Sequence, residues 1–272
     1  MNRKVMYAGQ FYTDLPIDLN EELETYFNEQ ENIDSNGCFG IICPHAGYIY
    51  SGRTASKSFN YVRNNQYKQI VIIAPSHRYF INPFSVGDYE YLETPIGNLK
   101  VKRSIVTELL KDPNYSFNRE ADQSEHSLEV QLPFIYHLFP NTEIIPILFS
   151  QQNHQNAKYL KDKLIEVIKD DLDKTLFVIS SDFSHYHSAS TARTLDLKAI
   201  EMICSLKCDD FFESILRQEI EACGFGGILF IMELARELGI RQAKDLEYTH
   251  SGLVNMDNQR VVGYASIVFE RS

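Results

Sequence analysis

Short apolar runs alternate with longer amphipathic segments along most of the chain. Strands are predicted for the apolar runs, at 38–43, 68–75, 142–149, 174–182 and 260–270. Helices are predicted at 51–64, 104–112, 127–139, 154–169, 189–217 and 224–239. This alternation is typical of a mostly parallel sheet covered by helices on both faces. No repeat or linker-like stretch interrupts it, so the pattern predicts a single-domain, three-layer α/β/α sandwich over residues 1–272.

Prolines and glycines refine this prediction. Residues 80–100 contain two prolines and two glycines among short alternating stretches, which favours β-hairpins over a helix. Pro133 is expected to kink the helix at 127–139 or to split it in two. Pro146 lacks an amide proton, so it argues against a central position for the whole length of strand 142–149.

Composition and charge exclude several functional classes. The 272 residues are 44% hydrophobic and 23% charged, as in an ordinary soluble globular protein. The net charge of −11 disfavours binding to nucleic acid or to an anionic membrane surface, because both need a basic footprint. The longest apolar stretches, such as 226–232, are too short to span a bilayer, and the first residues show no signal-peptide pattern.

The cysteines indicate a reducing environment. There are five of them, an odd number, and none is part of a CxxC pair. This is not the pattern of a disulfide framework or of a structural zinc site. We therefore expect free thiols in a cytoplasmic protein.

Histidines lie just beyond three of the predicted strands. His45 and His77 follow the first two strands, and Asp182 and His185 lie at the end of the fourth. In an open parallel sheet the carboxyl ends of the strands meet at one edge, where ligand crevices form. We therefore expect these side chains on the same side of the molecule.

Cys223 is a further candidate, because it lies just before the predicted helix at 224–239. The positive end of the helix dipole favours the thiolate, which is the form that ligates a metal. We predict that His45, His77 and Cys223 hold a metal ion. Such a set suits iron, zinc or copper, and three protein ligands leave a position open for water or substrate.

Three other polar side chains are candidates for proton transfer. Asp182 and His185 are expected beside the metal as supporting or acid/base groups. His126 begins a predicted helix together with Glu125. Either His126 points into the same crevice, or Glu125 caps the helix and His126 lies on its surface.

Six short motifs along the chain resemble those of a known family. They are AGQFY at 8–12, PHAGYIYSG at 44–52, APSH at 74–77, EHSLEVQLPF at 125–134, SSDFSHY at 180–186 and ACGFGG at 222–227. In this order they resemble the Memo family, whose prokaryotic members are often called AmmeMemoRadiSam system protein B. The resemblance implies a fold related to the class III extradiol dioxygenases.

The resemblance also implies functional residues. His45, His77 and Cys223 match the metal-site positions of the family, Asp182 and His185 match other pocket residues, and His126 lies in its EHS motif. Class III dioxygenases hold ferrous iron with two histidines and a glutamate, whereas this sequence has a cysteine at the third position. Iron is therefore the first candidate metal, with copper and zinc as the others. The family name further implies a functional link to a radical-SAM enzyme.

Three functions are consistent with these residues. The first is a redox-related, non-haem metal-dependent oxidoreductase acting on an unidentified small molecule or peptide. The second is a metal-free hydrolase, in which Cys223 attacks, His185 activates it and Asp182 orients His185. The third is a non-catalytic module with a vestigial site, which binds a ligand in a crevice lined by Tyr48 and Tyr50.

Overall fold

The structure is a computed structural model that describes residues 1–31, 35 and 37–271. Its centre is a mixed sheet in which four neighbouring strands run parallel, in the order β2-β9-β3-β8. These strands are β2 (Cys38–Cys43), β9 (Thr175–Ser180), β3 (Gln69–Pro75) and β8 (Glu143–Phe149). Nearly all of their residues are buried, because helices cover both faces of the sheet.

Shorter or antiparallel strands extend the sheet on both sides. Next to β2 lies the antiparallel β12 (Val261–Glu270), which also pairs with β11 (Lys244–His250) and β10 (His185–His187). Next to β8 lies β4 (Phe84–Val86), and β7 (Tyr115–Ser116) pairs with the other side of β4. A separate small sheet joins β1 (Asn2–Arg3), β5 (Tyr91–Thr94) and β6 (Gly97–Lys100).

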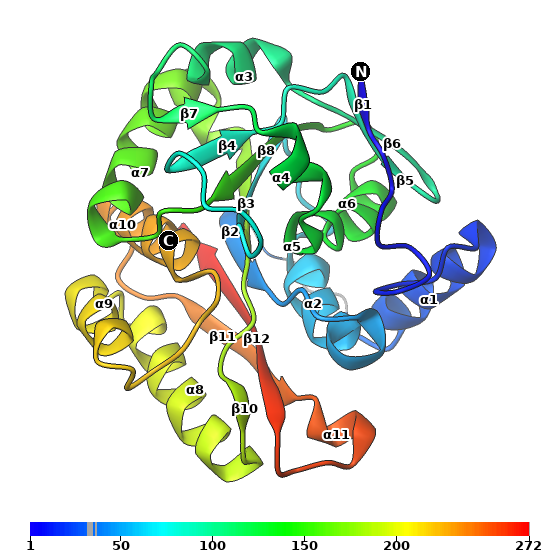
Figure 1. Ribbon diagram of the computed structural model, residues 1–272, viewed down its shortest axis with the longest axis vertical. Coiled ribbons are helices and arrows are strands. Elements are labelled where there is room, and N and C mark those ends of the chain that lie inside the picture. Colours follow the sequence, from blue (N-terminus) through cyan, green and yellow to red (C-terminus); the bar gives the residue numbers. More distant parts are fainter. Residues whose placement is uncertain (32–34, 36, 272) are drawn as a thin grey trace.

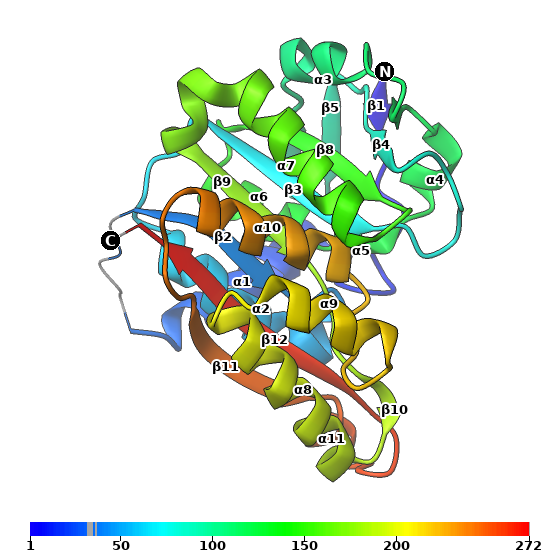
Figure 2. The ribbon, with the colours of Figure 1, turned by 90° about the vertical axis from the view of Figure 1, so that its left-hand side faces the viewer.

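The helices form the two outer layers, as Figures 1 and 2 show. One face is covered by α7 (His154–Ile168), α8 (Ala189–Cys204), α9 (Cys208–Leu216) and α10 (Phe225–Glu237). Behind the sheet in Figure 2 lie α1 (Pro16–Asn28), α2 (Tyr48–Val62) and α6 (Leu132–Leu138). The shorter helices are α3 (Arg103–Leu109), α4 (Arg119–Gln123), α5 (His126–Glu129), α11 (Gly252–Asn255) and the 3-10 helix Lys169–Lys174. None of the helices among the described residues combines the length and apolar character of a membrane span.

The predicted α/β fold is confirmed, with one refinement of the sheet. The four central strands pair parallel, whereas β12 pairs antiparallel with β2 and β4 pairs antiparallel with β8. Strand β8 pairs with β3 along its whole length but with β4 only at residues 147–149. Pro146 therefore limits pairing on one side, as its missing amide proton requires.

The sequence pattern missed some elements, but the predicted split of one helix is confirmed. The predicted helix at 127–139 is two helices, and Pro133 lies in the first turn of the second one, where a proline is favoured. The long helix α1 and the strand β11 were not predicted. The alternation of β11 is weak, because its residues are only partly buried at the outer edge of the sheet.

Candidate metal centre

The carboxyl ends of the four parallel strands place polar side chains around one point. His45 follows β2, Asp182 follows β9 and His77 follows β3. Because Cys43 pairs with Ser180 in the parallel register, the residues just beyond them are neighbours too. The backbone amide of His45 donates a hydrogen bond of 2.7 Å to Asp182 Oδ1.

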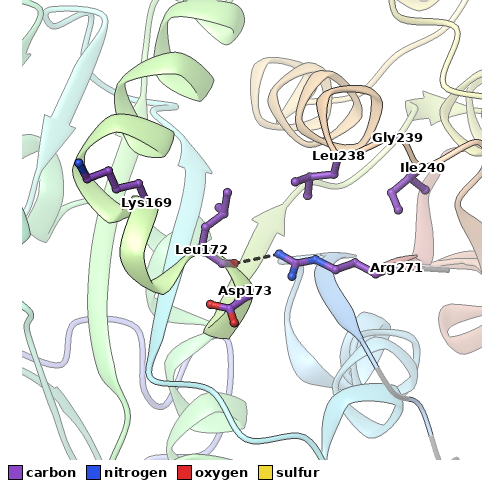
Figure 3. Close-up of a pocket in the computed structure, with 7 residues that line it drawn as sticks. All are labelled: Lys169, Leu172, Asp173, Leu238, Gly239, Ile240 and Arg271. Atoms are coloured by element: carbon purple, nitrogen blue, oxygen red, sulfur yellow. Dashed lines mark hydrogen bonds between the residues drawn. The ribbon is translucent and has the colours of Figure 1, made fainter.

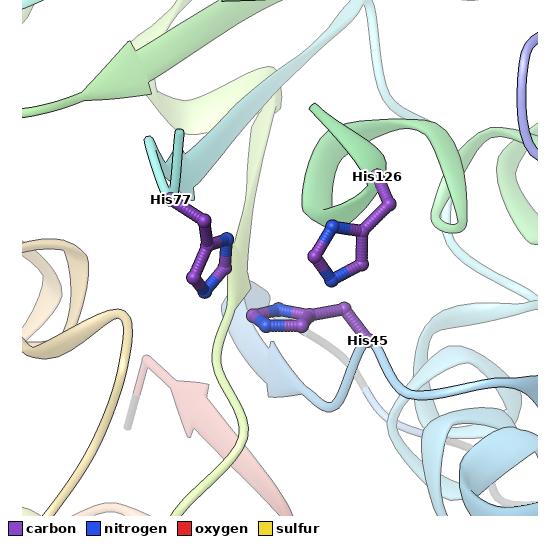
Figure 4. Close-up of side chains that lie close together, drawn as sticks. All are labelled: His45, His77 and His126. Carbon is purple, nitrogen blue, oxygen red and sulfur yellow. The ribbon is translucent and has the colours of Figure 1, made fainter. Parts of the chain in front are cut away.

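Three histidines form the centre of this edge. His126, the first residue of α5, brings its ring to those of His45 and His77, and one ring nitrogen of each lies within 4.8 Å of the others. Figure 4 shows the three rings around a common space. His45 is buried, His126 is partly buried and His77 is exposed, so the cluster has a closed floor and an open mouth. Its composition is compatible with metal binding.

The ring of His45 is held in one tautomer by its neighbours. The Ser180 hydroxyl donates its proton to the Ser127 carbonyl at 2.7 Å, so it can only accept from His45 Nδ1 at 2.8 Å. The proton of the neutral ring is therefore on Nδ1, which leaves the lone pair of Nε2 free. Burial, with the nearby charges of His77 and His126, lowers the pKa of His45 well below its usual range. The imidazole is neutral, as a metal ligand must be.

The carboxylate of Glu125 orients the other two rings. It accepts hydrogen bonds from His77 Nδ1 at 2.9 Å and from the His77 amide at 2.6 Å, and it lies 3.3 Å from His126 Nδ1. Burial opposes ionisation of Glu125, but the contacts with His126 and His77 outweigh it and lower the pKa of the carboxyl. This is the carboxylate–histidine arrangement that orients metal ligands and directs Nε2 away from the carboxylate.

The N-terminal segment forms one wall of the cluster. The ring of Phe11 lies 4.6 Å from that of His126, and the ring of Tyr7 lies 5.8 Å from it. The Phe11 carbonyl accepts a hydrogen bond from the Tyr48 amide, which fixes this segment to the start of α2. Phe11 of the AGQFY motif and Tyr7, the residue before the motif, therefore pack against the third histidine.

A buried arginine holds the chain that carries Glu125 and His126. Arg3 is fully buried and pairs with Asp122 at 3.0 Å and with Glu129 at 2.5 Å. The same guanidinium donates 3.0 Å hydrogen bonds to the carbonyls of Asp122 and Glu125. The position of Glu125 therefore depends on a residue more than a hundred positions away in the sequence.

Cys223 lies beside the cluster, on the side of His45. Its Sγ is 3.2 Å from His45 Nε2 and accepts a 3.1 Å hydrogen bond from the Asp182 amide. A Cβ on Gly224 would lie 2.3 Å from the Ser180 carbonyl, so only glycine allows the chain to approach β9 this closely. Gln152, just beyond β8, donates to the Cys223 carbonyl at 2.9 Å and fixes the loop from the fourth parallel strand.

The expected thiolate at Cys223 is wrong for the structure without a metal. Burial, and after it the charge of Asp182, raises the pKa of the thiol. The helix α10 begins at Phe225, two residues later, so Cys223 lies before its first turn. Cys223 is therefore a protonated thiol unless a bound cation displaces its proton.

Asp182 and His185 lie at the border of the cluster. Burial raises the pKa of Asp182, while the His45 amide and the charge of His185 oppose that rise. The His185 amide donates to Glu221, which also contacts His187 Nε2 at 2.7 Å. The triad expected for a hydrolase is not formed, because Asp182 binds the His45 backbone and it is His45, not His185, that contacts Cys223.

The structure brings all six candidate residues to one edge, and their chemical roles stay predictions. The structure combines the two alternatives for this segment, because Glu125 caps α5 through a 3.1 Å hydrogen bond from the Ser127 amide and His126 lies in the cluster. Sequence reasoning missed that the same carboxylate contacts His77. Tyr48 is a packing residue, because it is buried and its hydroxyl donates to the Val130 carbonyl. Tyr50 is partly exposed near the start of α2.

Comparisons with known proteins agree with these motifs. The family model described as Memo-like protein matches residues 3–268. A MEMO1 family protein from Thermoplasma volcanium is 35% identical, with 98% of both chains covered. Another from Methanosarcina barkeri is 34% identical over 98% of this chain and 100% of its own. A third, from Nitrosopumilus maritimus, is 33% identical over 99% of this chain and 100% of its own.

Proposed function

The protein belongs to the Memo family, and we propose that it is a metal-dependent redox protein whose metal lies among His45, His77 and His126. Iron is the proposed metal, with copper and zinc as the alternatives. The bound ion would supply Lewis acidity and, for iron or copper, one-electron redox chemistry. Every other contribution comes from the side chains of this edge.

The observation that carries the proposal is the arrangement of the imidazole nitrogens. Hydrogen bonds at Nδ1 hold the rings of His45 and His77, and the Nδ1 of His126 faces the same Glu125 carboxylate. Three imidazole nitrogens therefore meet in a cluster that is open on the side of His77. Three protein ligands with an open position are typical of reactive rather than structural metal sites.

Cys223 is proposed as a further donor beside His45. The sulfur lies close enough to His45 Nε2 for one ion to contact both. A cation at this point would lower the pKa of the thiol and offset the effect of burial. The third ligand beside His45 and His77 is then either His126, which the nitrogen positions favour, or Cys223, which the family motif favours.

The polar groups at the border of the cluster have separate roles in this proposal. Asp182 orients His45 through its backbone amide. His185 is the candidate for giving or taking a proton, because it lies near the cluster without belonging to it. The cytoplasmic location and the functional link to a radical-SAM enzyme are also part of the proposal, and they rest on the cysteines and on the family name.

The hypothesis of a metal-free hydrolase has less support than that of a metal-dependent redox protein. A nucleophilic thiol needs a lowered pKa and an adjacent base. Burial raises the pKa of Cys223, and its neighbouring ring is the buried His45. These two facts count against nucleophilic catalysis without a metal.

The test is elemental analysis of protein purified anaerobically without added metal. We expect close to one iron or copper per chain in the wild type and its loss in His45→Ala. The variants His126→Ala and Cys223→Ser separate the two possible third ligands, because only loss of a true ligand empties the site. Lys169→Ala, an exposed residue at the other edge of the sheet, is the control. Absence of metal in the wild type, even after reconstitution with ferrous iron, would refute the proposal.

A further inference from the structure

A shallow apolar pocket adjoins the histidine cluster. It has a volume of about 280 Å³ and lies between α9 and the start of α10. Its apolar lining includes Phe183, Ile215, Ile220 and Phe225. Phe183 and Ile220 are buried, so the floor is rigid core, while Ile215 and Phe225 are partly exposed at the sides.

The pocket and the cluster share Cys223. This residue lines the pocket, and its Sγ is 3.2 Å from His45 Nε2. His185 lines the same pocket, and it lies three residues after Asp182 in the chain. A molecule seated in the pocket would therefore have one end at the Cys223 side chain, whose sulfur contacts His45 on its other side.

We propose that this pocket, here called the Cys223 pocket, holds the apolar ring of a small neutral substrate of the metal centre. A hydroxyl or carbonyl oxygen on that ring would reach past Cys223 towards the histidines. This inference rests on the proposed function and adds a substrate class to it. Apolar pockets with a few convergent polar groups at one end are typical of small-molecule sites.

The size and the charge of the pocket define the class. An engineered protein cavity of about 150 Å³ binds benzene, so about 280 Å³ accommodates one ring system with a short substituent. Among the described residues that line the pocket, Glu221 is the acidic one, and it is fixed by the His185 amide at 3.1 Å and by His187 Nε2 at 2.7 Å. Its carboxylate disfavours an anionic ligand, and so does the net charge of −11.

The first experiment measures binding of a neutral probe by fluorine NMR. Fluoroindole is titrated into the wild type, and we expect saturable binding in the millimolar range or tighter. Ile215→Glu places a charge on the wall, and Ala222→Phe fills the pocket from a different lining residue. Each substitution should weaken binding at least tenfold. Leu216→Glu is the matched control, because Leu216 follows Ile215 in α9, is 61% exposed and does not line the pocket.

A second measurement tests the link to the metal. Paramagnetic cobalt bound at the histidines should broaden the fluorine signal of the pocket-bound probe, and diamagnetic zinc should not. A fluoroindole carboxylate should bind at least tenfold more weakly than fluoroindole. Binding that is equal in wild type and both pocket variants, or no binding at all, would overturn the pocket proposal.

The outcomes separate this inference from the proposed function. Binding of fluoroindole without any metal uptake would refute the metal-centre function and the link, and leave an apolar ligand site. Metal uptake with no probe binding would leave the proposed function intact and refute the pocket. Binding with equal line widths in cobalt and zinc protein would show that the pocket does not serve the metal centre.

Discussion

The two edges of the parallel sheet differ in the size of their pockets and in the side chains that meet there. Pocket size alone would point to the wrong edge as the candidate site. The opposite edge has the larger hollows, of about 490 and about 850 Å³, whereas the pocket beside the histidines measures about 280 Å³. Figure 3 shows Lys169, Asp173 and Arg271 around the first of these hollows, and their charged ends do not meet at one point. At the carboxyl edge three imidazoles converge. Convergent chemistry, rather than volume, therefore marks the candidate site.

The connections of the fold explain this difference. Each parallel strand ends at the carboxyl edge and leaves through a loop, so His45, His77 and Asp182 are collected there. The opposite edge receives the ends of helices and of the antiparallel β12. Arg271 follows β12 and donates to the Leu172 carbonyl at 3.1 Å, which joins the end of β12 to the 3-10 helix Lys169–Lys174. Its contacts are those of a structural residue.

The largest expected effect is loss of the metal from the histidine edge. His45→Ala removes the buried donor, and we expect zinc affinity measured by calorimetry to fall at least a hundredfold. Arg271→Ala, at the opposite edge, should leave that affinity unchanged. Equal zinc affinity in His45→Ala and wild type would contradict the proposed difference between the two edges, because the metal would then bind elsewhere.

The next largest effect concerns the free energy of unfolding and compares two arginines, Arg3 near the histidine edge and Arg271 at the opposite edge. Arg3→Met leaves Asp122 and Glu129 buried without their partner, and we expect the free energy of unfolding to fall by about 3–5 kcal/mol. Arg271→Met loses one carbonyl hydrogen bond and a contact with the Phe39 ring, which is worth about 1–2 kcal/mol. Urea denaturation measures both. A smaller loss for Arg3→Met than for Arg271→Met would contradict the role of Arg3 as the buried clamp.

Glu125→Gln tests the orientation of the rings with a smaller change. The amide keeps the shape of the side chain but loses the charge that holds His77 and His126. Loss of such a carboxylate partner lowers metal affinity about 10–100-fold. Asp173→Asn at the opposite edge is the control for removing one negative charge. If both substitutions weaken binding equally, the effect is general electrostatics and not ring orientation.

The smallest effects should come from the large hollow itself. Lys169→Ala and Asp173→Ala change exposed side chains that line it. We expect each to alter the free energy of unfolding by no more than about 0.5 kcal/mol and to leave metal content unchanged. A loss of metal in either variant would show that the opposite edge has a function of its own.

The sequence predicts the parts of the site that follow from strand order. His45, His77, Asp182 and His185 were found because each lies beyond an apolar run, and parallel strands bring such residues together. The sheet was predicted for the same reason, since buried strands have continuous apolar runs. The weak pattern of β11 was missed, because a strand at the outer edge is only partly buried.

The parts that depend on distant contacts were not predictable. Nothing local shows that Arg3 meets the segment carrying Glu125, or that Phe11 packs on His126. The protonation of Cys223 was also misjudged, because the helix dipole is visible in sequence whereas the burial that outweighs it is not. Such effects require the packed structure.

The most direct test is anomalous diffraction from a crystal soaked in zinc, with data collected on both sides of the zinc absorption edge. The account predicts one strong peak among the Nε2 atoms of His45, His77 and His126, with or without the Cys223 sulfur in contact. The peak should vanish in crystals of His45→Ala. An empty cluster would contradict the proposed metal site. So would a peak confined to another histidine that lies beside a carboxylate, such as His154 next to Glu233.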